Sequence, residues 1–108
     1  MTKRILKPER VRRTPSQFSW VDHRLIRSNY LQRAHASAWA LYLVLVTVGD
    51  EHGLSYYSDK TLQRLLKLSA EELGQARREL VMAEVLVYEA PLYQVLSLEG
   101  PEGVEARP

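Results

Sequence analysis

The chain has 108 residues, 45% of them apolar, and a formal net charge of +2, a size that suits one domain with a single core. The absence of cysteine excludes disulfides and thiolate metal sites and is typical of a reducing compartment. The longest apolar run, Ala38–Val46, is far shorter than the ~20 residues that span a bilayer. No apolar run follows the basic N-terminus, as a signal peptide requires. We therefore expect a soluble, cytoplasmic protein without a membrane partner.

Positive charge is concentrated at the N-terminus. Residues 1–20 sum to +5, residues 21–57 and 58–84 are each neutral, and residues 85–108 sum to −3. Residues 1–17 lack periodicity and contain Pro8 and Pro15, so they are expected to form a disordered or extended arm. Basic arms often bind nucleic-acid phosphate, and a solvated leader without a partner is the alternative. The candidate phosphate contacts of the arm are Arg10, Arg12 and Arg13.

Two helices are predicted in the first half of the chain. Val21, Leu25 and Ile26 recur at helical spacing and predict a short helix over about residues 21–28, with Ser19 as a possible cap. Residues 37–48 are nearly all apolar, which favours a helix that is buried on most sides. This core helix is expected to begin near residues 34–37 and to end at Gly49. We assign both Trp20 and Trp39 to the core.

The segment 58–81 contains two short helix patterns, each opened by a serine. The apolar sets are Leu62, Leu65 and Leu66 in the first pattern, and Leu73, Ala76, Leu80 and Val81 in the second. Their spacing predicts two helices with one buried face each. Ser69 and Glu72 form a capping box. Because only about three residues separate the helices, they must cross steeply, which is the helix-turn-helix geometry.

The second half of the chain also contains strand patterns. Residues 54–57 predict a short extended piece, and residues 85–89 and 92–98 predict a β-hairpin around Ala90 and Pro91. Tyr88 and Tyr93 are expected to pair across it. The order predicts a mainly α fold with a small β-hairpin (α+β), a winged helix-turn-helix. Its domain would span residues 18–98, with a tail at 99–108.

These elements resemble the winged-helix DNA-binding domains of bacterial and plasmid replication-initiator-like and transcription-regulator-like proteins. The resemblance is carried by residues 18–26, 40–43, 52–54 and 58–65, and by the frame Ser69, Leu73 and Ala76. It implies a cytoplasmic, nucleoid-associated protein that binds double-stranded DNA, with a role in transcription regulation, DNA replication or a mobile element. Two features depart from the pattern. The second helix starts Ala70-Glu71-Glu72, and the hairpin tip, residues 89–91, carries no Lys or Arg.

The candidate DNA contacts lie on both helices of the motif. On the second helix, Gln75 could read adenine and Arg78 a guanine or phosphate, with Arg77 nearer the boundary of the buried face. On the first helix, Lys60, Arg64 and Lys67 share one side and could contact phosphate. Solvated faces with side-chain pairing are the alternative for both helices. Either Tyr56 or Tyr57 is expected to pack inward, and the outward one could meet a phosphate; Tyr57 is our candidate.

Other functions have less support in the sequence. The histidines His23, His35 and His52 lack the spacing of a helical metal site, and no catalytic constellation or phosphate loop is evident. We expect neither enzymatic activity nor a cofactor. Dimerisation is expected, because a small contact set binds DNA weakly. The alternatives are a winged-helix module whose acidic second helix docks a protein partner, and RNA binding through the arm.

Overall fold

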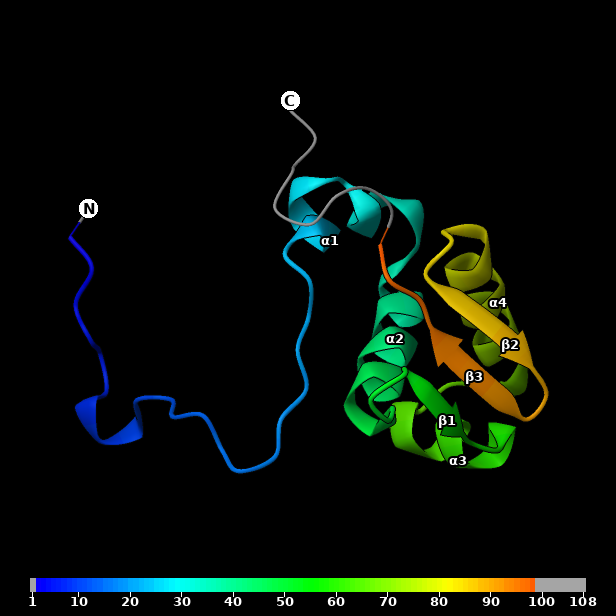
Figure 1. The fold of residues 1–108 in the computed structure, drawn as a ribbon, viewed down its shortest axis with the longest axis horizontal. Coiled ribbons are helices and arrows are strands. Elements are labelled where there is room, and N and C mark those ends of the chain that lie inside the picture. Colours follow the sequence, from blue (N-terminus) through cyan, green and yellow to red (C-terminus); the bar gives the residue numbers. More distant parts are fainter. Residues whose placement is uncertain (1, 99–108) are drawn as a thin grey trace.

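The computed structural model describes residues 2–98, which form an α+β structure (Figure 1). The predicted α+β class is therefore confirmed, and the predicted tail at 99–108 lies outside the described residues. In chain order the elements are η1 (Pro8–Arg10), α1 (Arg24–Arg27), η2 (Tyr30–Arg33), α2 (Ala36–Val48), β1 (Leu54–Tyr56), α3 (Asp59–Leu66), α4 (Ala70–Met82), β2 (Leu86–Glu89) and β3 (Leu92–Val95).

The core is built on α2, which packs most extensively against α4. The side chains of Leu41 and Leu45 from α2 and of Leu73 and Leu80 from α4 are fully buried. The predicted limits of this helix are confirmed, since it ends where Gly49 adopts an extended conformation. Because α2 also contacts α3 and β3, more than one of its sides must be apolar, which explains its nearly unbroken apolar sequence.

Short polar contacts set the limits of α3 and α4. The Ser58 hydroxyl accepts a hydrogen bond from the backbone N–H of Thr61 at 3.2 Å. The predicted capping box is confirmed: Ser69 Oγ accepts from the N–H of Glu72 at 3.0 Å, and Glu72 Oε1 accepts from the N–H of Ser69 at 2.9 Å. The three residues from Lys67 to Ser69 join the helices, and Lys67 adopts a left-handed conformation that turns the chain. Two predicted core residues, Leu65 and Val81, are instead exposed.

The strands form an antiparallel sheet in the order β1-β3-β2. The predicted hairpin is confirmed, and Tyr88 lies opposite Tyr93 with 4.4 Å between the ring centroids. The strand β3 ends at Val95 rather than at the predicted residue 98. Beyond it, the N–H of Leu96 donates to the carbonyl of Val85, and Leu98 is buried. One face of the sheet packs against α2 and α4, and the other face is exposed to solvent.

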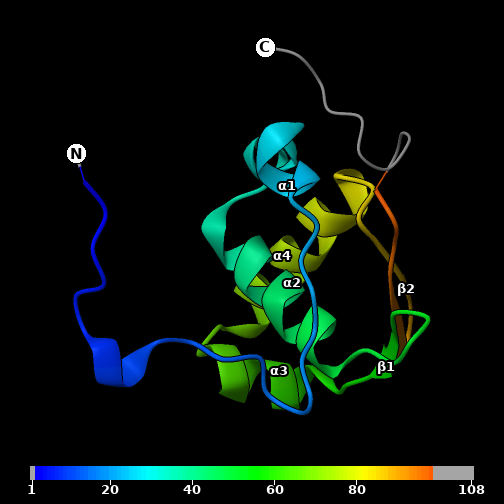
Figure 2. The ribbon, with the colours of Figure 1, turned by 60° about the vertical axis from the view of Figure 1, so that its left-hand side comes forward.

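The N-terminal part differs most from the prediction. Only four residues form α1, because the Asp22 carboxylate accepts from the N–H of Arg24 at 2.8 Å and Asn29 turns the chain with a left-handed conformation. Residues 18–22 instead pass along the outside of α2 (Figure 2), where the Ser19 hydroxyl donates to the carbonyl of Thr47 at 3.3 Å. The assignment of Trp20 to the core was wrong, since it is 72% exposed. Trp39 packs against the core as predicted.

Two glycines should respond to alanine with opposite signs. Gly53 has a φ of +80°, and a Cβ atom there would lie 2.6 Å from the carbonyl oxygen of Val95. We expect Gly53→Ala to lower the free energy of unfolding by about 1–2 kcal/mol or more. A Cβ atom on the helical Gly74 would meet only the end of the Arg78 side chain, at 3.4 Å. Gly74→Ala should therefore raise the stability by about 0.5–1 kcal/mol. Urea unfolding of both variants measures the contrast, and a stabilised Gly53→Ala would contradict it.

Candidate nucleic-acid interface

The helices α3 and α4 present the predicted contact residues unequally. Gln75 and Arg78 of α4 are exposed. The side chains of Lys60, Arg64 and Lys67, on α3 and its C-cap, are exposed too. The structure does not bring the arm to this surface. Figure 1 shows the arm leading away from the body on the side opposite α4, and this arm carries Arg10, Arg12 and Arg13.

Arg77 has a different position from the other candidates. Only 16% of its side chain is exposed. Its guanidinium donates to a carboxylate oxygen of Asp59 at 2.5 Å and to the hydroxyl of Tyr93 at 3.0 Å, and it lies 4.2 Å from the centroid of the Tyr88 ring. Burial alone would lower the pKa of Arg77, but the bonds to Tyr93 and Asp59 raise it above its ordinary value. This side chain therefore joins α4 to the start of α3 and to the hairpin.

Gln75 and Arg78 belong to a chain of hydrogen bonds on the exposed side of α4. An Arg78 nitrogen donates to the Gln75 carbonyl oxygen at 2.9 Å, and the Gln75 amide donates to Glu79 at 3.0 Å. The Glu79 carboxylate also accepts from the backbone N–H of His35 at 2.6 Å and contacts its ring Nδ1 at 2.9 Å. These bonds, that of the His35 backbone above all, lower the pKa of Glu79 to about 2. Both candidate readers are thus held in place but remain accessible.

The two tyrosines before α3 take opposite orientations. Tyr57 is partly buried and packs against the core, whereas Tyr56 is 69% exposed. The expectation that one packs inward and one points outward is confirmed. The outward residue is Tyr56, so our candidate phosphate contact Tyr57 is the less accessible of the two. Alternation along β1 could have indicated this, because Tyr56 lies two residues beyond the partly buried Leu54 on the outer side of the sheet.

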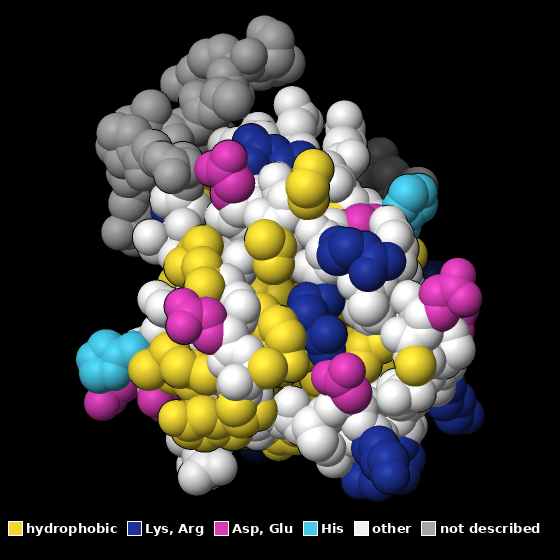
Figure 3. Space-filling view, turned by 90° about the vertical axis from the view of Figure 1, so that its right-hand side faces the viewer, with side chains coloured by type: hydrophobic (Ala, Val, Ile, Leu, Met, Phe, Trp, Pro, Cys, Tyr) yellow, Lys and Arg dark blue, Asp and Glu magenta, His cyan; other side chains and the backbone are white. Residues whose placement is uncertain are grey.

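The surface has mixed charge. Figure 3 shows Lys and Arg side chains interspersed with Asp and Glu, while hydrophobic side chains gather toward one edge of this view. Glu71 and Glu72 are exposed at the start of α4, and Glu72 is already engaged by the cap. The exposed Glu89 lies at the end of β2, next to the hairpin tip. A phosphate lattice would therefore meet cations from α3 and from the middle of α4, but not from the start of α4.

Comparisons with known proteins add no assignment: no protein-family model, curated protein or solved structure matches this chain. Among residues 2–98, no helix has the length and apolar character that crossing a bilayer requires. Within the same residues, no three His, Asp or Glu side chains gather where they could hold a metal ion. The chemistry of the surface residues is therefore the basis for a functional proposal.

Stability should distinguish the two neighbouring arginines of α4. Arg77→Ala removes the hydrogen bond to the Asp59 carboxylate and leaves the buried Tyr93 hydroxyl without its donor. We expect a loss of about 2 kcal/mol, whereas Arg78→Ala should change the stability by less than about 0.5 kcal/mol. Chemical denaturation measures both. The double variant Arg77→Ala/Tyr93→Phe should lose less than the sum of the single changes, and additive losses would show that the two side chains are not coupled.

The Glu79 contacts make the stability depend on pH. The pKa of Glu79 falls from an ordinary 4.5 to about 2 on folding, so the unfolded chain binds the proton more readily. The stabilisation is complete above the unfolded pKa and is lost as the pH falls toward about 2. Glu79→Gln should flatten this part of the profile of melting temperature against pH. Glu89→Gln, which removes one carboxylate at the end of β2, is the matched control for the change in net charge.

Proposed function

We propose that the chain is a winged-helix protein that binds double-stranded DNA through α3 and α4, with α4 in the major groove. The observation that carries the proposal is the joint placement of the two helices. A three-residue turn joins them, and Gln75 and Arg78 lie outward on α4 while Lys60 and Arg64 lie outward on α3. The strand order β1-β3-β2 next to these helices is in keeping with a wing. A role in transcription regulation, replication or a mobile element follows from the resemblance alone.

Base reading would fall to the middle of α4. Gln75 can make a bidentate contact to adenine and Arg78 to guanine, each pair being worth ~1–3 kcal/mol of discrimination. Both side chains would exchange their mutual hydrogen bond for bonds to base edges. Such an exposed bond contributes little to the stability of the protein, so the exchange is cheap. Glu71 and Glu72 repel phosphate, which excludes the start of α4 from close contact with the backbone.

Phosphate contacts would come from Lys60, Arg64 and Lys67 beside the groove, and from the arm residues Arg10, Arg12 and Arg13. The first set fixes the orientation of the protein on the duplex, and the second adds affinity that does not depend on sequence. Arg77 takes a different role from the one that its sequence position suggests. Its bonds to Asp59 and Tyr93 would hold the hairpin at a set angle to α4, so it would position the wing rather than contact DNA.

The second candidate is a protein-interaction module. Exposed Glu71 and Glu72 at the start of α4, together with a hairpin tip without Lys or Arg, favour a basic protein partner over a phosphate lattice. The same surface would serve DNA binding and protein binding. Variants with reversed charges on that surface therefore distinguish the two functions. A preference for RNA in the same assay would identify the third possibility, binding through the arm.

DNA binding should depend on α4, and it should depend on the arm to the same degree for every DNA sequence. We expect fluorescence anisotropy at low salt to show binding that weakens as salt rises. Gln75→Glu/Arg78→Glu should abolish it, whereas deletion of residues 2–13 should weaken binding to all sequences alike and reduce the salt slope. Arg27→Glu on α1 reverses a charge away from α3 and α4 and serves as the control. If arm deletion removes all binding and the α4 changes have no effect, the helices are not the DNA reader.

A further inference from the structure

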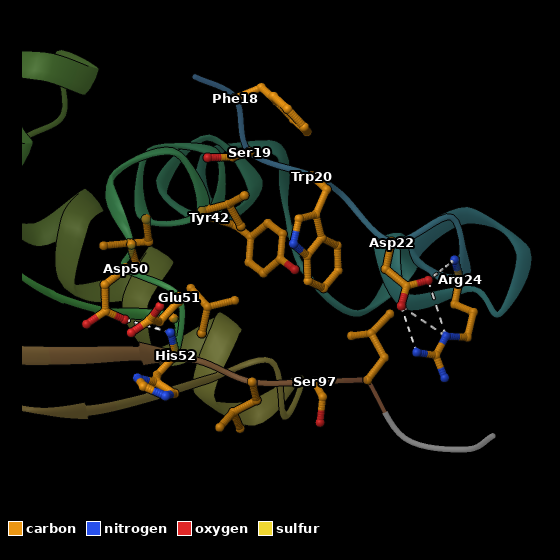
Figure 4. Close-up of a pocket in the computed structure, with 17 residues that line it drawn as sticks. Phe18, Ser19, Trp20, Asp22, Arg24, Tyr42, Asp50, Glu51, His52 and Ser97 are labelled. Atoms are coloured by element: carbon orange, nitrogen blue, oxygen red, sulfur yellow. Dashed lines mark hydrogen bonds and ion pairs between the residues drawn. The ribbon is translucent and has the colours of Figure 1, made fainter. Parts of the chain in front are cut away.

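A groove with a volume of about 650 Å³ lies on the outside of α2. Its walls are the segment 18–22, the second half of α2, the turn 49–53 and the chain that leaves β3. Figure 4 shows the rings of Trp20 and Tyr42 side by side in the groove, with Phe18 above them. Phe18 and Trp20 are 69% and 72% exposed. Large aromatic side chains at such exposure in a groove mark a surface that is suited to a partner.

The two ends of the groove differ in charge. At one end, the Asp22 carboxylate accepts hydrogen bonds from the Arg24 guanidinium, with 2.7 Å between the closest atoms, so the two charges offset each other. At the other end lie Asp50 and Glu51 (Figure 4). Bonds from the N–H groups of Leu54 and His52 lower the pKa of Asp50, so this end stays negative. The groove therefore combines apolar side chains with two acidic residues at one end, Asp50 and Glu51, which a basic and apolar segment would complement.

A segment with those properties exists in the arm of the same chain. Ile5 and Leu6 are 66% and 81% exposed. They are flanked by Lys3, Arg4 and Lys7. Figure 1 shows this end of the arm far from the body of its own chain. Burial of the two adjacent aliphatic side chains, which now face water, would be favourable. The five residues Lys3–Lys7 therefore match the groove in both apolar character and charge.

We propose that the groove binds the segment Lys3–Lys7 of a second copy of the chain, so that two copies exchange their arms. The arm joins the body of the chain just before Phe18, in the wall of the groove. The short helix η1 (Pro8–Arg10) and the seven residues from 11 to 17 together reach roughly 29 Å. Two grooves related by a two-fold axis can therefore each receive the arm of the other copy. Pro15 favours an extended course of the residues between η1 and the body. Arg10, Arg12 and Arg13 stay in the connecting stretch, free for phosphate.

The oligomeric state tests the exchange. Sedimentation of the full chain over a range of concentrations should show a monomer–dimer equilibrium that salt weakens. Ile5→Asp/Leu6→Asp in the arm, or Trp20→Ala in the groove, should raise the dissociation constant at least roughly tenfold. Both changes are at exposed positions, so at concentrations where the wild type is monomeric the unfolding curves should match that of the wild type. A mixture of the two variants should regain dimers, since one intact arm meets one intact groove.

A disulfide reports which chains meet, because the natural chain has no cysteine. We expect Leu6→Cys on one chain to crosslink to Ser97→Cys, in the groove, on another chain. Leu43→Cys lies exposed on α2 outside the groove and should crosslink far less. The proposal is overturned if the wild type is monomeric at all concentrations, or if the arm variant dimerises as well as the wild type. It is also overturned if a chain carrying both Leu6→Cys and Ser97→Cys crosslinks within a monomer.

Discussion

The position of the hairpin relative to the two surface helices depends on the guanidinium of Arg77. A charge with so little exposure is costly unless it is paired, and its partners come from three other elements: Asp59 from α3, Tyr88 from β2 and Tyr93 from β3. Because the guanidinium is planar and donates in fixed directions, satisfying Asp59 and Tyr93 together restricts how the hairpin can tilt against α4. The geometry of any surface shared by α3, α4 and the hairpin follows from that restriction.

Local patterns predicted the helices and strands because the forces that set them are local. The capping box needs only Ser69 and Glu72 three residues apart, and the limits of α2 follow from its apolar run and Gly49. The role of Arg77 could not be predicted, because Tyr93 lies 16 residues away and reaches Arg77 only through the fold. Trp20 was misplaced for a similar reason. An aromatic residue near the core helix suggests burial, but the extended course of residues 11–22 leaves it on the surface.

The exposed side of α4 is stabilised by its own hydrogen bonds. Arg78, Gln75 and Glu79 form a chain that ends on the backbone of His35, just before α2. Only the last bond connects two elements, so the Glu79 carboxylate contributes to tertiary structure, while the other bonds mainly orient side chains. Hydrogen bonds between exposed side chains add little net stability, because water offers equivalent partners. The candidate readers are therefore preorganised at low cost and can release each other when a ligand offers better partners.

Nucleic-acid binding requires attraction to phosphate and selection of a site, and the charge of this chain is distributed unevenly between the parts that would meet these two requirements. The folded body is close to neutral between residues 21 and 84, and the excess of cations belongs to the arm. Attraction to phosphate would then come chiefly from the arm, which can follow the DNA backbone without a fixed register. The neutral helices would select the site on the duplex. A single α4 offers only two candidate base contacts. Two copies joined through their arms would present two such helices, and the linked second contact gains effective concentration without any new residue.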